Sequence, residues 1–111
     1  MSRGLGDVYK RQGLLRLIEL ARLPPPVPQF EVVVGPGRSR FIDIAYPAAR
    51  LALEYDGVEA HMNPEAFETD RRRQNELVEL GWRFLRYTNA DLRDRPYGVI
   101  AQIRRQLDLW S

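Results

Sequence analysis

The stretch that decides the fold is FIDIAYPAARLALEYDG, residues 41–57. It holds two apolar runs, residues 41–46 and 51–55, separated by a short segment that begins with Pro47. With Arg40, the first run is the predicted strand of residues 40–46. Two apolar runs around so short a connection predict antiparallel strands joined by a tight turn. We therefore expect a β-hairpin at the centre of the fold.

Three carboxylates lie within these two strands or directly after them. If Tyr46 faces Leu51 across the turn, Asp43 faces Glu54, and side chains in such positions are only about 4.5–5.5 Å apart. Asp56 follows Glu54 by two residues and points to the same face. Like charges this close need a shared proton or a hard divalent cation such as Mg²⁺ or Mn²⁺. The alternative is that the acids lie on a solvated face or pair with nearby arginines.

Turn and cap residues divide the rest of the chain into further elements. Asn63 and Pro64 favour the start of a helix, and Gly81 suits its end. The pattern predicts further helices over residues 14–23, 64–80 and 96–109 and further strands over residues 30–34 and 82–87. We therefore expect an α/β (α+β) fold, in which a mixed four-stranded sheet is flanked by helices and a C-terminal helix follows.

Length and composition exclude several classes of protein. The chain has 111 residues, enough for one domain with a modest core. It has no cysteine, which excludes disulfides and thiolate zinc sites and favours a reducing, cytoplasmic location. No apolar run approaches the ~18 residues of a membrane helix. Lys10 is the only lysine, and the many arginines suit phosphate oxygens, although a GC-rich genome has the same effect.

His61 and two residues of the helix beyond it are the candidate partners of the acids. His61 is the only histidine, and it fits a general base, a general acid or an outer partner of a metal. An exposed loop histidine is an equally good interpretation. Arg73 can hold a phosphate or tie down a carboxylate, with Asp70 orienting it. The alternative is an ordinary surface pair between these two residues.

Further arginines are candidates for substrate binding. Arg71 lies in the basic run of residues 71–73, and Arg40 flanks the second strand of the hairpin. Such runs are usually solvated, but they also fit a phosphate footprint. Trp82 and Phe84 alternate with other residues as in a strand, which favours a place in the core over base stacking.

The ordered set of these residues resembles the PD-(D/E)XK nuclease superfamily. The closest pattern is that of its very-short-patch-repair (Vsr)-like endonuclease branch, the domain-of-unknown-function family 559. The matching residues are Asp43, Glu54-Tyr55-Asp56-Gly57, His61, Asp70-Arg71-Arg72-Arg73, Leu77, Gly81 and Phe84-Leu85-Arg86-Tyr87. The resemblance implies a restriction-endonuclease-like αβββαβ core and Mg²⁺-dependent cleavage of phosphodiester bonds. It makes Asp43 and Glu54 metal ligands and gives His61 a catalytic role.

The chain departs from this family pattern in three ways. Asp56 stands where the superfamily commonly has lysine, so the role of that lysine would pass to His61, Arg73 or a water. The cysteine-containing zinc site of the repair enzymes cannot form here. A glutamate expected near residues 11–13 is missing, and Glu19 is a doubtful substitute.

Residues 1–12 look unlike the rest of the chain. They resemble a translated sequencing adapter, so we treat them as an artefact or disordered segment and assign residues 13–111 to a single endonuclease-like domain. Related modules often follow a DNA-binding domain in a longer protein. We therefore expect this domain to be the C-terminal part of such a protein, with a possible fused N-terminal DNA-binding domain.

Two functions follow from the sequence. The first is a Mg²⁺-dependent endonuclease or nicking enzyme that acts on DNA, with Asp43, Glu54, Asp56 and His61 as catalytic residues. The second is a catalytically inactive nucleic-acid-binding module on the same fold. A weaker third interpretation is an interaction domain whose acids pair with its own arginines.

Overall fold

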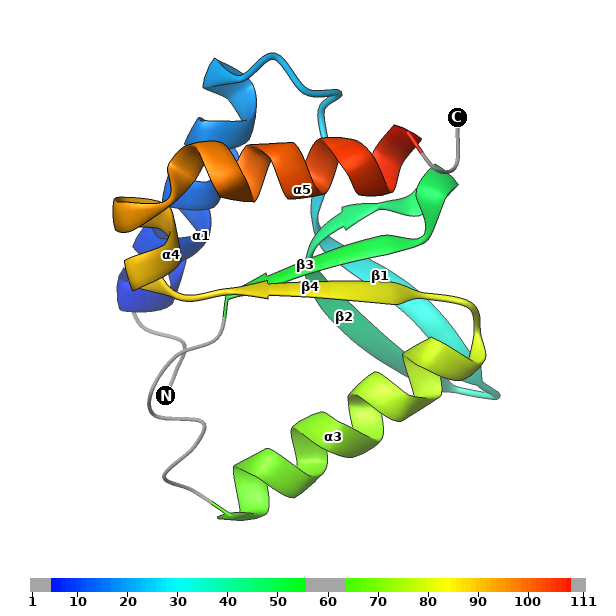
Figure 1. The fold of residues 1–111 in the computed structure, drawn as a ribbon. Helices are drawn as coiled ribbons and strands as arrows, with labels where there is room; N and C mark the ends of the chain where they lie inside the picture. Colours follow the sequence, from blue (N-terminus) through cyan, green and yellow to red (C-terminus); the bar gives the residue numbers. More distant parts are fainter. Residues whose placement is uncertain (1–4, 56–63, 109–111) are drawn as a thin grey trace.

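The computed structural model describes residues 5–55 and 64–108, with side chains from residue 11 onward. It forms one mixed sheet with helices on both faces (Figure 1). In chain order the elements are α1 (Leu5–Leu20), β1 (Val27–Gly35), β2 (Arg38–Tyr46), the 3₁₀ helix η1 (Pro47–Ala49), β3 (Leu51–Tyr55), α3 (Pro64–Glu79), β4 (Arg83–Tyr87), α4 (Asn89–Asp94) and α5 (Pro96–Asp108). The predicted α+β fold is confirmed.

The four strands follow the order β1-β2-β3-β4 in the sheet. β1, β2 and β3 form an antiparallel meander, and β4 pairs with β3 in parallel. The parallel step requires a crossover, which α3 provides on one face of the sheet, while α1, α4 and α5 lie on the other (Figure 1). This is the arrangement predicted from the hairpin and the helix after it.

The register of the central hairpin is as predicted. Tyr46 pairs with Leu51, and Ala45 pairs with Ala52. The connection is one turn of 3₁₀ helix, η1, closed by the Arg50 N–H, which donates to the carbonyl of Pro47 over 3.1 Å. A connection this short fixes the register and brings the two acid-bearing strands side by side.

Each face of the sheet has its own core. The core on the α1 and α5 face includes Leu14, Ile18, Ile44, Leu51, Leu53, Val99 and Ile103. The core on the α3 face is smaller and consists of Ile42, Ala45, Ala52, Leu77 and Trp82, with Phe30, Val32, Val34 and Phe84 packed against it. Trp82 and Phe84 therefore belong to the core, as the sequence favoured.

The alternation of side chains along β2 is interrupted at Asp43. Ile42 packs on the α3 face and Ile44 on the opposite face, although residues two apart in a regular strand share a face. On β1, Gln29 lies level with Asp43 and has a φ of 51°, in the left-handed region. β1 and β2 are thus both distorted at the level of Asp43.

The helix ends agree partly with the sequence. Gly81, with a φ of 93°, ends α3 as predicted, and the Trp82 N–H donates to the carbonyl of Leu77 over 3.1 Å. Arg22 plays the same part after α1, with a φ of 58°. The predicted cap Asn63 lies outside the described residues.

Two helices differ from their predictions. α1 begins at Leu5 and not at residue 14, because apolar spacing marks only the buried part of a helix, and nothing upstream stops the backbone. α4 was not predicted as a separate helix. Thr88 caps it, and Asp91 completes a capping box. No described helix is long and apolar enough to cross a membrane.

Candidate active site

Glu54 is the buried acid of the site. It stands near the end of β3 on the α3 face, and only 5% of its surface is exposed. One of its oxygens, Oε2, accepts the backbone N–H of Asp43 over 3.3 Å. Burial raises the pKa of the Glu54 carboxyl, and the neighbouring Asp43 raises it further, while Arg73 opposes both. A carboxylate held in this way needs a positive charge beside it.

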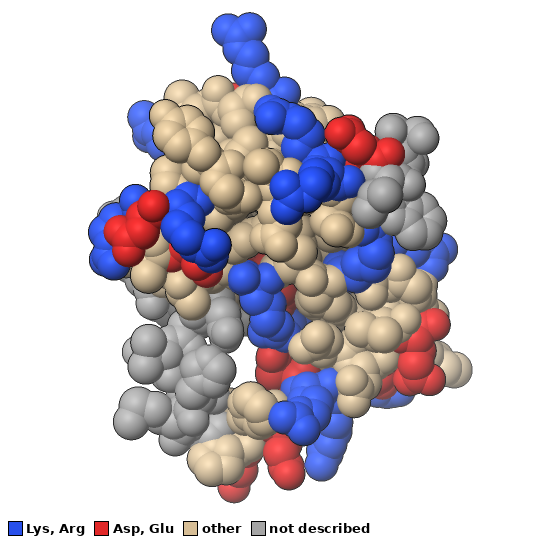
Figure 2. All heavy atoms as spheres, in the orientation of Figure 1, with Lys and Arg blue, Asp and Glu red and all other residues tan. Residues whose placement is uncertain are grey.

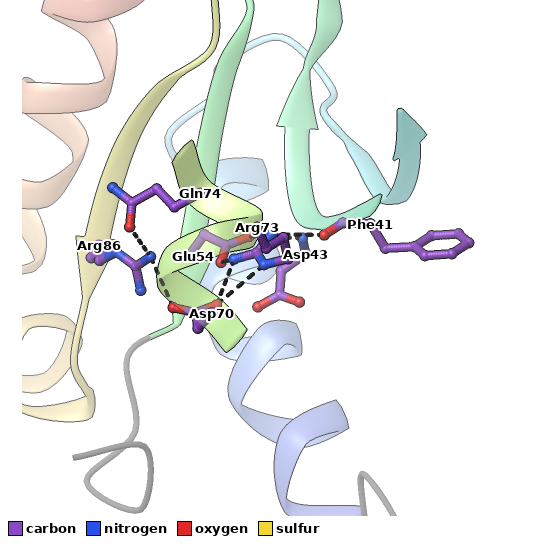
Figure 3. A network of polar contacts seen from close by, with 7 residues as sticks. All are labelled: Phe41, Asp43, Glu54, Asp70, Arg73, Gln74 and Arg86. Carbon is purple, nitrogen blue, oxygen red and sulfur yellow. Dashed lines mark hydrogen bonds and ion pairs between the residues drawn. The ribbon is translucent and has the colours of Figure 1, made fainter. Parts of the chain in front are cut away.

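Asp43 is the second acid and lies directly beside Glu54. It is half-buried at the distortion of β2, one step beyond the pairing of Ile44 with Leu53. Figure 3 draws no hydrogen bond or ion pair from its carboxylate to the other labelled residues. The predicted juxtaposition of the two acids is therefore present, and the Asp43 carboxylate is not tied to an arginine of the described part of the chain.

Arg73 supplies the positive charge beside Glu54. It reaches down from α3, its side chain is 16% exposed, and its Nη2 forms an ion pair with Glu54 Oε1. Its Nη1 donates to the carbonyl of Phe41 over 2.9 Å and lies 3.5 Å from Glu54 Oε2. Burial lowers the pKa of Arg73, but Glu54 and Asp70 outweigh that effect and raise it. The helix thus covers the acid pair, as the sequence indicated.

Asp70 forms a second layer around Arg73. Its Oδ1 accepts Arg73 Nε over 3.1 Å and Nη2 over 3.0 Å, and its Oδ2 pairs with Arg86 over 3.2 Å. Arg86 also donates to Gln74 over 2.6 Å (Figure 3). Asp70 therefore contacts Arg73 through two hydrogen bonds, and a role in orienting Arg73 stays a prediction.

Arg86 and its partner Gln74 are members of this network that were not predicted from the sequence. Arg86 lies directly opposite Glu54 in the parallel register of β3 and β4. An arginine within the apolar strand of residues 82–87 was the available signal. Its meaning depended on a strand pairing that the sequence left open.

Two predicted catalytic residues, Asp56 and His61, lie outside the described residues. Arg40 and Arg71 lie on the α3 face, but neither is part of the network around Glu54. Arg40 Nε donates to Glu76 over 2.7 Å, and the Arg71 guanidinium lies 4.6 Å from the centre of the Phe67 ring. Figure 2, in the orientation of Figure 1, shows lysine and arginine atoms spread over the visible side of the molecule, with carboxylates between them.

The donor atoms of the site fit a hard divalent cation in part. Asp43 and Glu54 supply two carboxylates from neighbouring positions of β2 and β3, and Asp43 is near enough to raise the pKa of Glu54. Mg²⁺ commonly uses one or two carboxylates and completes its shell with water and substrate oxygens. Within residues 5–55 and 64–108, no three histidine, aspartate or glutamate side chains are grouped to hold a metal. The pair can therefore hold a cation only with ligands from elsewhere.

Comparison with known proteins gives a consistent result. The family model REase_MTES_1575 matches residues 31–107, a stretch that includes both acids and Arg73. Two proteins of Mycobacterium tuberculosis are similar: "Uncharacterized protein MT2308" of strain CDC 1551 / Oshkosh and "Uncharacterized protein Rv2248" of strain ATCC 25618 / H37Rv. Each is 36% identical over 86 residues, which cover 78% of this chain and 32% of the relative. The chain thus spans about a third of the length of these relatives, and no solved structure matches it.

Proposed function

The chain belongs to the restriction-endonuclease-like family REase_MTES_1575, and on that premise we propose that it is a metal-dependent endonuclease that hydrolyses DNA phosphodiester bonds. One observation carries the proposal: Asp43 and Glu54 lie side by side on neighbouring strands at the edge of the apolar core of the α3 face, and Glu54 accepts the backbone N–H of Asp43. A fold loses stability by placing two acids so close, which favours a functional reason for the pair.

The two acids would both be ligands of a Mg²⁺ or Mn²⁺ ion, each in a different way. Glu54 is fixed by burial and by its backbone hydrogen bond, so it gives the site a rigid oxygen. Asp43 is half-buried and can face both a cation and a substrate. When bound, the cation would supply a Lewis acid that stabilises negative charge at the phosphodiester. Asp56 and His61 remain proposed catalytic partners, His61 for proton transfer.

The α3 face offers the positive charge for a DNA backbone. Arg71 and Arg72 line an open hollow of about 550 Å³, which also includes one acid, Glu68. An exposed guanidinium beside this hollow can bind the phosphate oxygens of a DNA strand that approaches from solvent. Arg40 would have to leave Glu76 to do so. We also propose that the chain lies near the Vsr-like branch and domain family 559.

A plasmid-nicking assay tests the catalytic role. With Mg²⁺ or Mn²⁺ present, Asp43→Asn should lower the nicking rate by more than about 100-fold, because loss of a mere outer partner of a metal already costs about 10–100-fold. Glu31→Gln, which removes an exposed acid from β1, is the matched control and should leave the rate unchanged. Equal nicking by the parent and by Asp43→Asn would contradict the proposal.

A second candidate function is a catalytically inactive nucleic-acid-binding module. The observation that favours it is the ion pair of Arg73 with Glu54, which neutralises one acid without a metal. This module would bind DNA with an affinity that falls steeply with salt and does not depend on divalent cations. Calorimetric titration with Mn²⁺ separates the two functions. Binding that Asp43→Asn abolishes supports the nuclease, and no binding supports the module.

A further inference from the structure

Arg73 occupies the oxygens of Glu54 that a cation would need. Its Nη2 pairs with Oε1, while its Nη1 lies 3.5 Å from Oε2, the oxygen that also accepts the Asp43 N–H. A guanidinium and a divalent cation are both positive, and beside a carboxylate as buried as that of Glu54 they repel each other. Arg73 and a cation therefore cannot both engage Glu54 fully.

Arg73 also has a second carboxylate within reach. Asp70 Oδ1 already accepts two of its donors, Nε over 3.1 Å and Nη2 over 3.0 Å. Asp70 is more exposed than Glu54, and its other oxygen is held by Arg86. Arg73 can thus give up Glu54 and keep a paired charge, with little movement of the helix.

We propose that Arg73 is a built-in counter-ion that competes with a divalent cation for Glu54, and that Asp70 receives it when the cation binds. This inference rests on the proposed function, because it takes Asp43 and Glu54 as the metal ligands. Without a cation, Arg73 keeps the two acids together and limits the cost of burying Glu54. With a cation, Arg73 turns to Asp70, and its Nη1 exchanges the carbonyl of Phe41 for a phosphate oxygen. The protein thereby has a weak metal site that tightens when a substrate engages Arg73.

Mn²⁺ titration of four variants tests the inference, with calorimetry as the readout in place of nuclease activity. Arg73→Gln removes the competitor and should bind Mn²⁺ about tenfold more tightly than the parent. Asp70→Asn removes the receiving carboxylate and should bind several-fold more weakly. Arg72→Gln makes the same change of charge at the exposed neighbouring position and should bind like the parent.

The double variant Asp70→Asn/Arg73→Gln distinguishes the proposed hand-over from a general electrostatic effect. If Asp70 acts through Arg73, the double variant should bind Mn²⁺ as Arg73→Gln alone does. If the two changes simply add, or if Arg73→Gln binds no better than the parent, the inference is wrong. Asp70→Asn changes a partly exposed side chain, so its weaker binding can be measured even if Arg73→Gln folds poorly.

The same titration separates the inference from the proposed function. Mn²⁺ binding that is lost in Asp43→Asn but unaffected by Arg73→Gln leaves the metal site intact and overturns only the role of Arg73. No Mn²⁺ binding by any variant, Arg73→Gln included, overturns both.

Discussion

Tyr46 and Tyr87 stand in similar surroundings but differ in their hydrogen bonds. Both are buried, and burial is the largest effect that raises the pKa of each to about 12. The Tyr87 hydroxyl donates to Gln102 Oε1 over 2.8 Å. The Tyr46 hydroxyl has no hydrogen-bond partner among the described residues. A buried hydroxyl without a partner lowers stability, and a paired one does not.

The two Tyr→Phe substitutions should therefore have different effects. Tyr46→Phe should leave the free energy of unfolding unchanged or raise it by up to about 1 kcal/mol, whereas Tyr87→Phe should lower it by about 1 kcal/mol. Urea denaturation measures both. An equal loss in the two variants would mean that the Tyr46 hydroxyl is in fact satisfied.

The sequence was sufficient to pair Asp43 with Glu54 but not to complete the site. The short η1 connection sets their register locally, and the period of two along a strand does the rest. Arg86 meets Glu54 only through the parallel pairing of β3 with β4. The chain between those strands contains a whole helix, so no turn fixes that register and local reasoning could not find it.

At the level of elements, two glycines that look alike in the sequence have opposite roles. Gly81 ends α3 with a φ of 93°, and a Cβ there would lie 3.3 Å from Arg50 Nη1. Gly13 lies inside α1, where a Cβ would meet nothing within 4 Å. Side chains are disfavoured in the left-handed region and favoured in a helix interior.

We expect Gly81→Ala to lower the free energy of unfolding by about 1–2 kcal/mol and Gly13→Ala to raise it by about 0.5–1 kcal/mol. Thermal denaturation followed by circular dichroism measures both changes. If Gly81→Ala were neutral, the chain would have to end α3 in another way than the structure describes.

The capping box of α4 should make stability depend on pH. Hydrogen bonds from the Arg95 side chain, and then from the Thr88 backbone N–H, hold the pKa of Asp91 below its ordinary value of 3.8. A carboxyl whose pKa is lowered by folding stabilises the protein above that ordinary value and loses this effect as the pH falls. The contribution of Asp91 is therefore present at neutral pH and absent in strong acid.

Asp91→Asn should be less stable than the parent at about pH 7, and the difference should shrink to near zero by about pH 2. Thr88→Ala leaves the charge of Asp91 but removes the hydroxyl that caps the helix and also donates to Asp91, so it should cost about 1 kcal/mol at neutral pH and less than that in strong acid. Urea denaturation at a series of pH values measures both. A difference for Asp91→Asn that does not vary with pH would contradict this account.

Elements bounded by clear turn or cap residues were predicted best. The Gly81 cap and the short η1 connection each act locally, so α3, β2, β3 and β4 were predicted nearly in place. β1 is longer than predicted and begins at Val27 in place of residue 30. α4 was missed although Thr88 and Asp91 have the spacing of a capping box. Its six residues end just before Pro96, and proline is the stronger start signal for a helix in this stretch.

At the scale of the whole molecule, one sheet separates two cores, and residues of β2 and β3 belong to both. Leu77 is fully buried in the smaller core, and Val78 beside it on α3 is 50% exposed. Leu77→Ala should lower the free energy of unfolding by about 2–5 kcal/mol, and Val78→Ala should change it by less than about 0.5 kcal/mol. Denaturation followed by circular dichroism and by tryptophan fluorescence should give coincident curves. Separate transitions would mean that the two faces unfold independently.

Ala45 and Ala52 have one more consequence. They face each other in the centre of the sheet, beneath Leu77, and neither has any exposed surface. Their methyl groups set how closely the crossover helix can approach. A larger side chain at Ala52 would push α3 away from the sheet. The Arg73 guanidinium would then lie slightly farther from Glu54, although no charged group had been changed. The ion pair between Arg73 and Glu54 would then weaken with the volume of the side chain at position 52 alone, although that side chain touches neither residue.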